Sequence, residues 1–421
     1  MGISFKHSGL VFILALSGCA QPISSGAFDA AALSGGQELE PTITADQYVA
    51  GLRKVKGLLL DRPFLTRAEQ ATTDLAGYQS FVRVYLEDPT APLAIQRLYQ
   101  QILQLEGSEM ITAFNNGVNA ELSIDNNEPA ALAAYLFKSN GDFRSLVTAN
   151  YCVTEYASGL ALKADCLHQG RLRRNDNNTT DPNRFFSVTT PAEMRAGAIS
   201  TQAFLKKYAG ALNFRRASMV REVFLCGNYP DSQETSGWTR QNLQLHPFYH
   251  TPIGGDQDCQ SCHTSLNRVR GFFTGFGTLG EIQMGRTVIR LGDLVEGQTD
   301  ALTINDVERT LINLPNYESL YGRSRATAFE GVIDSYHGQA LSLSGAYPKL
   351  SEYGQIISSD PQFAVCTAQR LYNFALGIGQ SFLNKLPARH SERLPNALEG
   401  SNYNIKSVMV DIFSTTDFLN R

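Results

Sequence analysis

The spacing of apolar residues predicts helices over most of the chain from residue 45 to about residue 226. Starting at Ala45, apolar side chains recur with the period of about 3.6 residues that marks one face of an α-helix. The same period continues over residues 78–88, 91–106 and 128–138. The run Thr190-Pro191-Ala192-Glu193 has a threonine cap, a proline at the first helical position and a glutamate three residues after the cap. We therefore expect a helix to start there and helices to continue through about Cys226.

Helical spacing returns in the C-terminal part. Asp360-Pro361 is expected to cap and open one helix, residues 405–413 form another with one apolar face, and a weaker signal covers 305–312. Residues 151–166 are typical of a short β-hairpin and 175–182 of a loop. Between residues 227 and 297, Gly, Gln, Thr and aromatic residues are frequent and periodicity is weak. The pattern predicts a mainly α helical body with a minor β-hairpin and a Gly-rich irregular region.

The composition is that of a folded protein. Of 421 residues, 43% are hydrophobic and 18% charged, so the chain can bury a core and wholesale disorder is excluded. The formal charge is 36 − 40 = −4, with acidic and basic residues mixed along the chain. Because no run of Lys and Arg is long enough to line a nucleic-acid groove, nucleic acid is not expected among the partners.

The N-terminus resembles an export signal. Lys6 precedes an apolar run over residues 10–16, which is less than half the roughly 20 residues needed to span a bilayer. The run ends in Leu16-Ser17-Gly18-Cys19, which resembles the bacterial lipoprotein box, where cleavage leaves the cysteine as a lipid-bearing N-terminus. We predict a signal peptide at 1–18 and a lipid anchor on Cys19 that holds the protein on a membrane of the bacterial cell envelope, either facing the periplasm or in the outer membrane.

Residues 19–44 are predicted to be a tether between the anchor and the folded body. Positions 20–42 are rich in Ala, Ser, Gly and Pro and show no apolar periodicity. A flexible chain of about 23 residues spans roughly 25 Å. That reach is enough to lift a folded body clear of the lipid head groups.

The strongest chemical signal is Cys259-Gln260-Ser261-Cys262-His263, a C-x-x-C-H motif of the kind that attaches c-type haem. On one helical turn the two sulfurs lie on the same face, where each can add to a haem vinyl group, and His263 becomes the proximal iron ligand. With seven Cys and seven His in the chain, the motif arises by chance in roughly two chains per thousand. Covalent haem is attached after export, which the N-terminal signal independently supplies.

Rival interpretations of the same region are weaker. A thioredoxin-like C-x-x-C would need an alternating βαβ pattern, and a zinc ribbon would need a second paired motif. Neither pattern accompanies Cys259 and Cys262. The nearby Gly275-Phe276-Gly277-Thr278-Leu279-Gly280 matches G-x-G-x-x-G but also lacks a βαβ context. Glycines that let the backbone pass close to a porphyrin edge are the simpler explanation for it.

The second axial ligand of the iron is expected among three residues. Met284 follows the haem histidine, as the methionine does in compact cytochrome c modules, and lies in the Gly-rich segment. His337 is the next candidate, and His250 would reach from upstream. A methionine ligand raises the reduction potential and favours electron transfer, whereas an open site permits small-molecule chemistry.

Four further cysteines are expected to form disulfides, because lone thiols are a liability in an oxidising compartment. Three pairings of Cys152, Cys166, Cys226 and Cys366 are possible. The pairing Cys152–Cys166 would close the predicted hairpin. It leaves Cys226–Cys366 to join the helix before the haem region to the helix after it.

Several segments resemble, in the same order, the planctomycete-type cytochrome c proteins. They are residues 216–226 (RASMVREVFLC), 259–277 (CQSCHTSLNRVRGFFTGFG), 350–377, with a cysteine-bearing helix ending in Ala-Leu-Gly, and 402–418, with a terminal amphipathic helix ending in Ser/Thr-x-x-Phe. Residues 55–59 (VKGLL) and the helices after them are similar to the N-terminal part of related deltaproteobacterial lipoproteins. The resemblance implies a helical, haem-bearing, exported protein and supplies no substrate. Asn267-Arg268 replaces the Asp-Pro usual after the haem histidine, so the family's loop shape is not carried over.

These features predict five segments: a lipoprotein signal peptide (1–18), a flexible tether (19–44), an N-terminal helical domain (45–228), a c-type haem-binding region (229–300) and a C-terminal helical domain (301–421). The expected function is single-electron transfer through one haem c between periplasmic redox partner proteins. No catalytic residue is assigned, because no paired carboxylates, Ser-His-Asp set or metal cluster stands out. The alternatives are a haem-dependent oxidoreductase that activates peroxide or a substrate, for which the length of 421 residues argues, and a surface-binding protein stapled by the haem.

Overall fold

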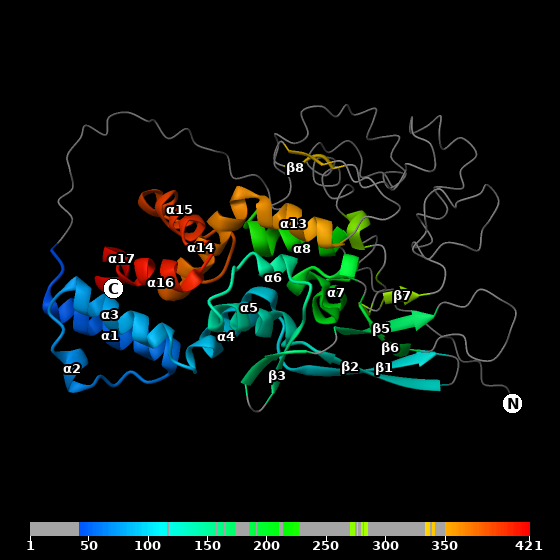
Figure 1. Cartoon of the computed structure of the whole chain (residues 1–421), viewed down its shortest axis with the longest axis horizontal. Helices are drawn as coiled ribbons and strands as arrows, with labels where there is room; N and C mark the ends of the chain where they lie inside the picture. Colours follow the sequence, from blue (N-terminus) through cyan, green and yellow to red (C-terminus); the bar gives the residue numbers. More distant parts are fainter. Residues whose placement is uncertain are drawn as a thin grey trace, which may run out of the picture. The chain divides into compact units, whose positions relative to one another are not determined.

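The computed structural model describes residues 42–115, 118–156, 159–163, 166–172, 185–190, 192–209, 214–227, 270–273, 276, 279–280, 282–284, 333–336, 339–341 and 350–421. All of them belong to one unit, Thr42–Arg421. Over these residues the fold is mainly α with several short strands, which confirms the fold class that the apolar spacing predicts (Figure 1).

The N-terminal helices form where the apolar spacing predicts them. A capping box opens α1, in which the backbone N–H of Thr44 donates to Gln47 Oε1 at 2.7 Å. Asp74 caps α3, and its Oδ1 accepts from the backbone N–H of Gly77 at 2.7 Å. Such caps satisfy amide groups that have no partner inside the helix. The helices are α1 Ala45–Leu60, α2 Arg67–Gln70, α3 Leu75–Leu86, α4 Ala91–Leu103, α5 Glu128–Lys138 and α6 Ser145–Thr148.

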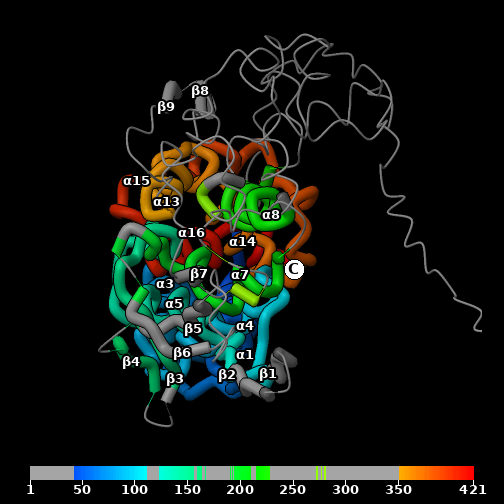
Figure 2. Tube along the Cα trace, turned by 90° about the vertical axis from the view of Figure 1, so that its right-hand side faces the viewer, coloured from blue at the N-terminus to red at the C-terminus, as the bar shows by residue number. Residues whose placement is uncertain are grey.

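The strands of the described residues form four small sheets. The predicted hairpin is present as β3 and β4, but the antiparallel pair β1 and β2 was not predicted. A three-stranded sheet has the order β6-β5-β7, with β7 parallel to β5 (Figure 2). The strands are β1 Ser108–Asn115, β2 Val118–Asp125, β3 Val153–Tyr156, β4 Gly159–Leu162, β5 Leu167–Leu172, β6 Phe185–Thr189, β7 Ile282–Met284, β8 Ile333–Tyr336 and β9 Gln339–Leu341.

The helix predicted to start at Thr190 begins as a 3₁₀ turn but does not continue as an α-helix. Two 3₁₀ turns follow Thr190, η1 Ala192–Met194 and η2 Gly197–Ser200, and regular helices begin only with α7 Gln202–Lys207 and α8 Phe214–Leu225. The reason lies in the tertiary packing of Gly197. Its φ is +52°, and a Cβ there would lie 2.3 Å from the carbonyl oxygen of Leu146 in α6. This left-handed conformation and close approach interrupt a helix that the local capping signal favours.

The two C-terminal helices predicted at Asp360-Pro361 and over residues 405–413 start where the sequence places them. Asp360 caps α14, its Oδ1 accepting from the backbone N–H of Gln362 at 2.8 Å, and Pro361 is the first helical residue. The helix predicted over 305–312 lies outside the described residues. The elements are α13 Leu350–Ser359, α14 Pro361–Ala375, η8 Ala388–His390, α15 Arg393–Gly400, α16 Ile405–Phe413 and α17 Thr416–Leu419.

Helices from the two ends of the described chain share one core. In Figure 1, α16 and α17 lie beside α1 and α3. The buried Tyr78 hydroxyl of α3 donates to the carbonyl of Phe413 at 2.9 Å, and Gln47 Nε2 donates to Asn420 Oδ1 at 2.6 Å. Lys406 of α16 donates to Glu87 at 2.8 Å. The N-terminal helices therefore depend on the C-terminal helices for burial of their apolar faces.

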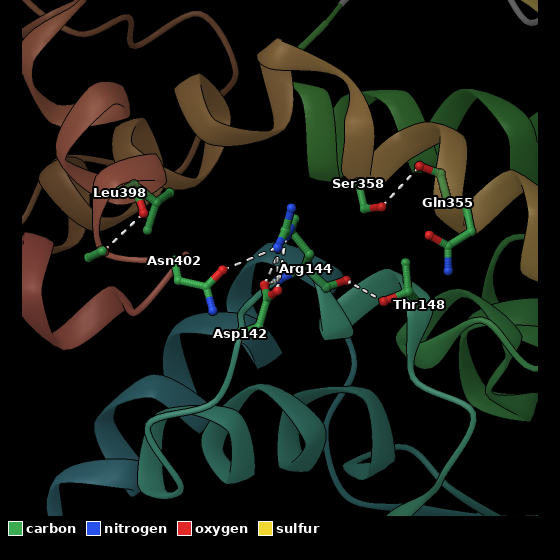
Figure 3. A network of polar contacts seen from close by, with 8 residues as sticks. Asp142, Arg144, Thr148, Gln355, Ser358, Leu398 and Asn402 are labelled. Atoms are coloured by element: carbon green, nitrogen blue, oxygen red, sulfur yellow. Dashed lines mark hydrogen bonds and ion pairs between the residues drawn. The ribbon is translucent and has the colours of Figure 1, made fainter.

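A second region of close packing joins α6 to α13. A Cβ on Gly354 would lie 2.1 Å from the carbonyl oxygen of Val147, a distance that side-chain movement cannot relieve. Beside this crossing, the guanidinium of Arg144 donates to both oxygens of Asp142 and, at 3.4 Å, to Asn402 Oδ1 (Figure 3). It also lies 4.4 Å from the centre of the Tyr403 ring. The backbone contact at Gly354 holds residues 142–148 against α13. The polar network holds the same residues against Asn402 and Tyr403, just before α16.

The contact at Gly354 predicts a large effect of one methyl group. Gly354→Ala should lower the free energy of unfolding by about 3 kcal/mol, because the added carbon meets backbone atoms that cannot move aside. Gly400→Ala is the control: nothing lies within 4 Å of its Cβ position, so the change should stay within about 1 kcal/mol. Urea denaturation of both variants measures the difference. Equal midpoints would show that α13 and α6 are not in backbone contact.

Candidate functional site

The predicted haem and lipid residues lie outside the described part of the chain. This holds for Cys19, His250, Cys259, Cys262, His263 and His337. Of Met284, the structure gives only the backbone: it is the last residue of β7 and pairs with Leu172 of β5. The structure therefore gives no distances among these residues. What the structure shows is how the chain is held on both sides of the motif.

The segments that flank the motif pack into the helical core. Before it, the chain leaves α8 at Cys226 and Gly227; after it, residues 270–273 form η5, and 276, 279 and 280 follow. These segments contact α7, α8, α13 and α14 through the interactions described next. We call α7, α8, α13, α14 and η5 together the flanking frame.

A disulfide joins the last turn of α8 to α14. Cys226 and Cys366 are bonded, with their Cα atoms 5.1 Å apart and a sequence separation of 140. Lys385 Nζ donates to the carbonyl of Cys226 at 2.9 Å, which satisfies an acceptor at the end of the helix. The pairing is the one that the sequence favours, and Cys152–Cys166 is likewise bonded beside the β3–β4 hairpin. The chain therefore enters the predicted haem region from a covalently fixed point.

Buried arginines on α8 and α14 donate hydrogen bonds to backbone carbonyl groups of the flanking frame and of the chain next to it. Arg216 is 1% exposed, and its guanidinium donates to the carbonyl of Leu205 at 2.7 Å and to that of Phe276 at 3.2 Å. Arg370 is 4% exposed and donates to the carbonyl of Glu222 at 3.1 Å. Burial lowers the pKa of Arg370 from its usual value, because desolvation penalises the charged form. Arg221 is also buried.

Aromatic rings fix η5 to α13. Phe272 stacks on Tyr353 with ring centres 4.8 Å apart and planes 9° apart, and Phe273 meets the same ring edge-on at 6.0 Å. All three side chains are fully buried. Pairs of this kind add to the stabilisation from apolar burial. The segment directly after the predicted haem motif is thus part of the core.

Gly280, the last glycine of the G-x-G-x-x-G run, has a packing role. Its φ is +72°, and a Cβ there would lie 2.6 Å from the carbonyl oxygen of Gln202 at the start of α7. Gln202 Nε2 donates to the carbonyl of Leu279 at 3.2 Å. The glycine is needed because the backbone passes directly against a helix.

A polar cluster near the C-terminus was not found by sequence reasoning. His390 is buried, its Nε2 lies 2.9 Å from Asp417 Oδ2, and Arg393 Nη2 lies 3.3 Å from its Nδ1. The Tyr372 hydroxyl donates to the same carboxylate oxygen at 2.5 Å, and Arg389 forms an ion pair with that carboxylate. Burial, with the two nearby guanidinium groups, lowers the pKa of His390 to about 4. These residues do not form a short sequence motif, so nothing in the local sequence predicts that they lie close together.

A recess beside the Cys152–Cys166 disulfide contains the half-buried carboxylate of Glu128. Glu128 at the start of α5 pairs with Lys163 at 3.0 Å, and Tyr151, Arg195 and Ser200 also line the recess. Burial raises the pKa of Glu128, against the opposing effect of Lys163. Because the neighbour of Glu128 is the cation of Lys163, we interpret the two residues as an ion pair with a structural role. Within the residues that the structure describes, no group of three or more His, Cys, Asp and Glu side chains is arranged to hold a metal ion.

Comparisons with known proteins add no assignment. No protein-family model, no curated protein and no solved structure matches the chain. None of the described helices is both long and apolar enough to cross a membrane.

The two disulfides should differ in how much they stabilise the fold. Cys226→Ser with Cys366→Ser should lower the free energy of unfolding by about 5 kcal/mol, and Cys152→Ser with Cys166→Ser by about 3 kcal/mol. The first bond closes a loop of 140 residues and the second one of 14, so the first restricts the unfolded chain more. Urea denaturation of the two double variants tests the order. A larger loss for the 152/166 pair would contradict a central role for the α8–α14 joint.

The low pKa of His390 makes a pH-dependent contribution to stability. Since the folded state holds this imidazole neutral down to about pH 4 and the unfolded chain protonates it near pH 6.5, the contribution is complete above about pH 6.5 and is lost as the pH falls toward 4. In His390→Asn the unfolding free energy should therefore fall less steeply between about pH 7 and pH 4. Urea midpoints across that range measure the slopes. Parallel slopes in the two proteins would show that His390 does not titrate in this way.

Proposed function

We propose that the protein is a membrane-anchored periplasmic c-type cytochrome that carries single electrons through one covalently bound haem. The observation that carries this proposal is the C-x-x-C-H motif at residues 259–263, in a chain that begins with a lipoprotein-type signal ending at Cys19. Its partners would be the membrane, through the lipid on Cys19, and periplasmic redox proteins.

The use of the cysteines supports the proposal. Two disulfides take up four of the seven. Cys19, Cys259 and Cys262 remain, and these are the residues assigned to one lipid and two thioether bonds. Each cysteine in the chain then has a role that suits an oxidising compartment.

The residues of the motif match the chemistry of the group. Cys259 and Cys262 would hold the porphyrin, His263 would ligate the iron on one side, and Met284 or His337 would do so on the other. Haem c, when bound, supplies one-electron redox chemistry. The chain's own contribution is to fix both ends of the segment to the flanking frame. Arg216 of that frame donates to the carbonyl of Phe276, which follows the motif in sequence.

A haem-dependent oxidoreductase is the second candidate. The observation that favours it is the size of the helical body, since the described helices extend from residue 45 to residue 419 and an electron carrier needs far less. Carbon monoxide separates the two candidates, because it binds only an iron with an exchangeable sixth position.

The haem assignment predicts a covalent adduct. Mass spectrometry of the exported protein should find haem on the peptide that contains Cys259 and Cys262, because both sulfurs add to vinyl groups. The adduct should be lost in Cys259→Ala with Cys262→Ala and retained in the control Cys152→Ser with Cys166→Ser. An exported, folded protein without the adduct would remove all haem-based functions.

Spectra of the same samples test electron carriage and the distal ligand. The reduced α-band should be unchanged by CO if the iron has two protein ligands; a CO-bound spectrum would favour the oxidoreductase. Met284→Ala should abolish a methionine-to-iron charge-transfer band. A band that persists would direct the assignment to His337.

A further inference from the structure

An aromatic side chain projects from the loop between α1 and α2. Phe64 is 87% exposed, more than any other exposed large hydrophobic residue of the described chain. Pro63 precedes it, and Leu65 after it packs against the core. Proline restricts the backbone and Leu65 anchors the loop, so the ring of Phe64 is held in the solvent. Because the ring leaves its apolar area in water, a surface that buried it would gain free energy from the contact.

The sequence around Phe64 is basic. Residues 53–67 include five Lys and Arg and one Asp, a net charge of +4 by 5 − 1, in a chain whose net charge is −4. Arg53, Arg62 and Arg67 are exposed, and Lys54 Nζ lies 5.9 Å from the centre of the Phe418 ring of α17. The one acid of the stretch, Asp61, pairs with Arg97 at 2.9 Å, and Arg62 lies 4.0 Å from Asp88. The stretch therefore carries a net positive charge beside an apolar tip.

This surface lies on the element that follows the tether. α1 starts at Ala45, directly after the predicted tether, and the loop leads from its end back to α2 (Figure 1). Lys56 of α1 and Glu69 of α2 form an ion pair at 2.8 Å, which places α2 against α1. The tether predicted from the sequence, with a reach of roughly 25 Å, would keep such a surface at high effective concentration near the predicted lipid anchor. Even weak intrinsic affinity for the bilayer then suffices for contact.

We propose that the α1–α2 loop is a docking surface for anionic phospholipid membranes, with Phe64 entering the interfacial layer and Arg53, Arg62 and Arg67 facing the lipid phosphates. The inference rests on the proposed membrane anchorage. A projecting ring among dispersed cations suits a deformable anionic surface better than a protein partner, which would need a shaped pocket for the ring. Docking would fix the orientation of the anchored body.

Vesicle binding without the lipid anchor tests the proposal. The full chain carrying Cys19→Ala, so that no lipid is attached, is incubated at low salt with phosphatidylcholine vesicles that contain about one third phosphatidylglycerol, and with vesicles of phosphatidylcholine alone. Sedimentation should show binding to the first and little to the second. Phe64→Ser should weaken binding about tenfold and Arg62→Gln about fivefold. Leu383→Ser is the control, because Leu383 is 69% exposed and lies outside the loop.

The outcomes separate this proposal from the anchor and the haem. No binding to anionic vesicles, equal binding to neutral ones, or an equal loss in Leu383→Ser would overturn it. Because Phe64 is exposed, Phe64→Ser should keep the parent's unfolding midpoint, so a loss of binding is not a loss of fold. Mass spectrometry of the protein with its native Cys19 detects the lipid on Cys19 and the haem on Cys259. Their absence would refute the proposed function without changing the vesicle result.

Discussion

The Cys226–Cys366 disulfide is the interaction on which the arrangement of this protein depends. It joins α8 to α14 across 140 residues, among them the predicted haem segment. Without it, closing so long a loop would rest on non-covalent contacts alone, at a large cost in chain entropy. With it, α14 presents its buried face to α8, and the α13–α6 contact at Gly354 and the shared core of α3 and α16 form around that joint.

Most helices could be predicted because their information is local. The apolar period and the caps at Thr44 and Asp360 lie within a few residues of the helices they begin. The failure at Thr190 has a different cause, since the capping signal there is sound. What overrides it is the contact of Gly197 with the backbone of Leu146, some fifty residues away, and no local pattern encodes that contact.

The same distinction explains what could be predicted of the site. The C-x-x-C-H motif is readable because its chemistry requires a fixed short spacing. The flanking frame could not be predicted, because it depends on contacts between residues such as Phe272 and Tyr353 that lie far apart in sequence. His390 and Asp417 meet for a similar reason, through the packing of the last helices. The three possible disulfide pairings could be narrowed to one from the sequence, because one of the two bonds in that pairing closes the predicted hairpin.

The buried guanidinium groups show how α7, α8 and the chain that follows the motif are held together. Leu205 and Glu222 lie in the last turns of α7 and α8, where carbonyl groups have no partner inside the helix and the helix dipole is negative. Arg216 and Arg370 donate to these two carbonyls. Arg216 also reaches the carbonyl of Phe276, so one side chain satisfies a helix end and binds the returning chain. A fork of several donors can do this, whereas a lysine would offer a single point of charge. The described chain is therefore fixed on both sides of the predicted haem segment, at Cys226 by its disulfide to α14 and at Phe276 by the charge-assisted bond from Arg216 of α8.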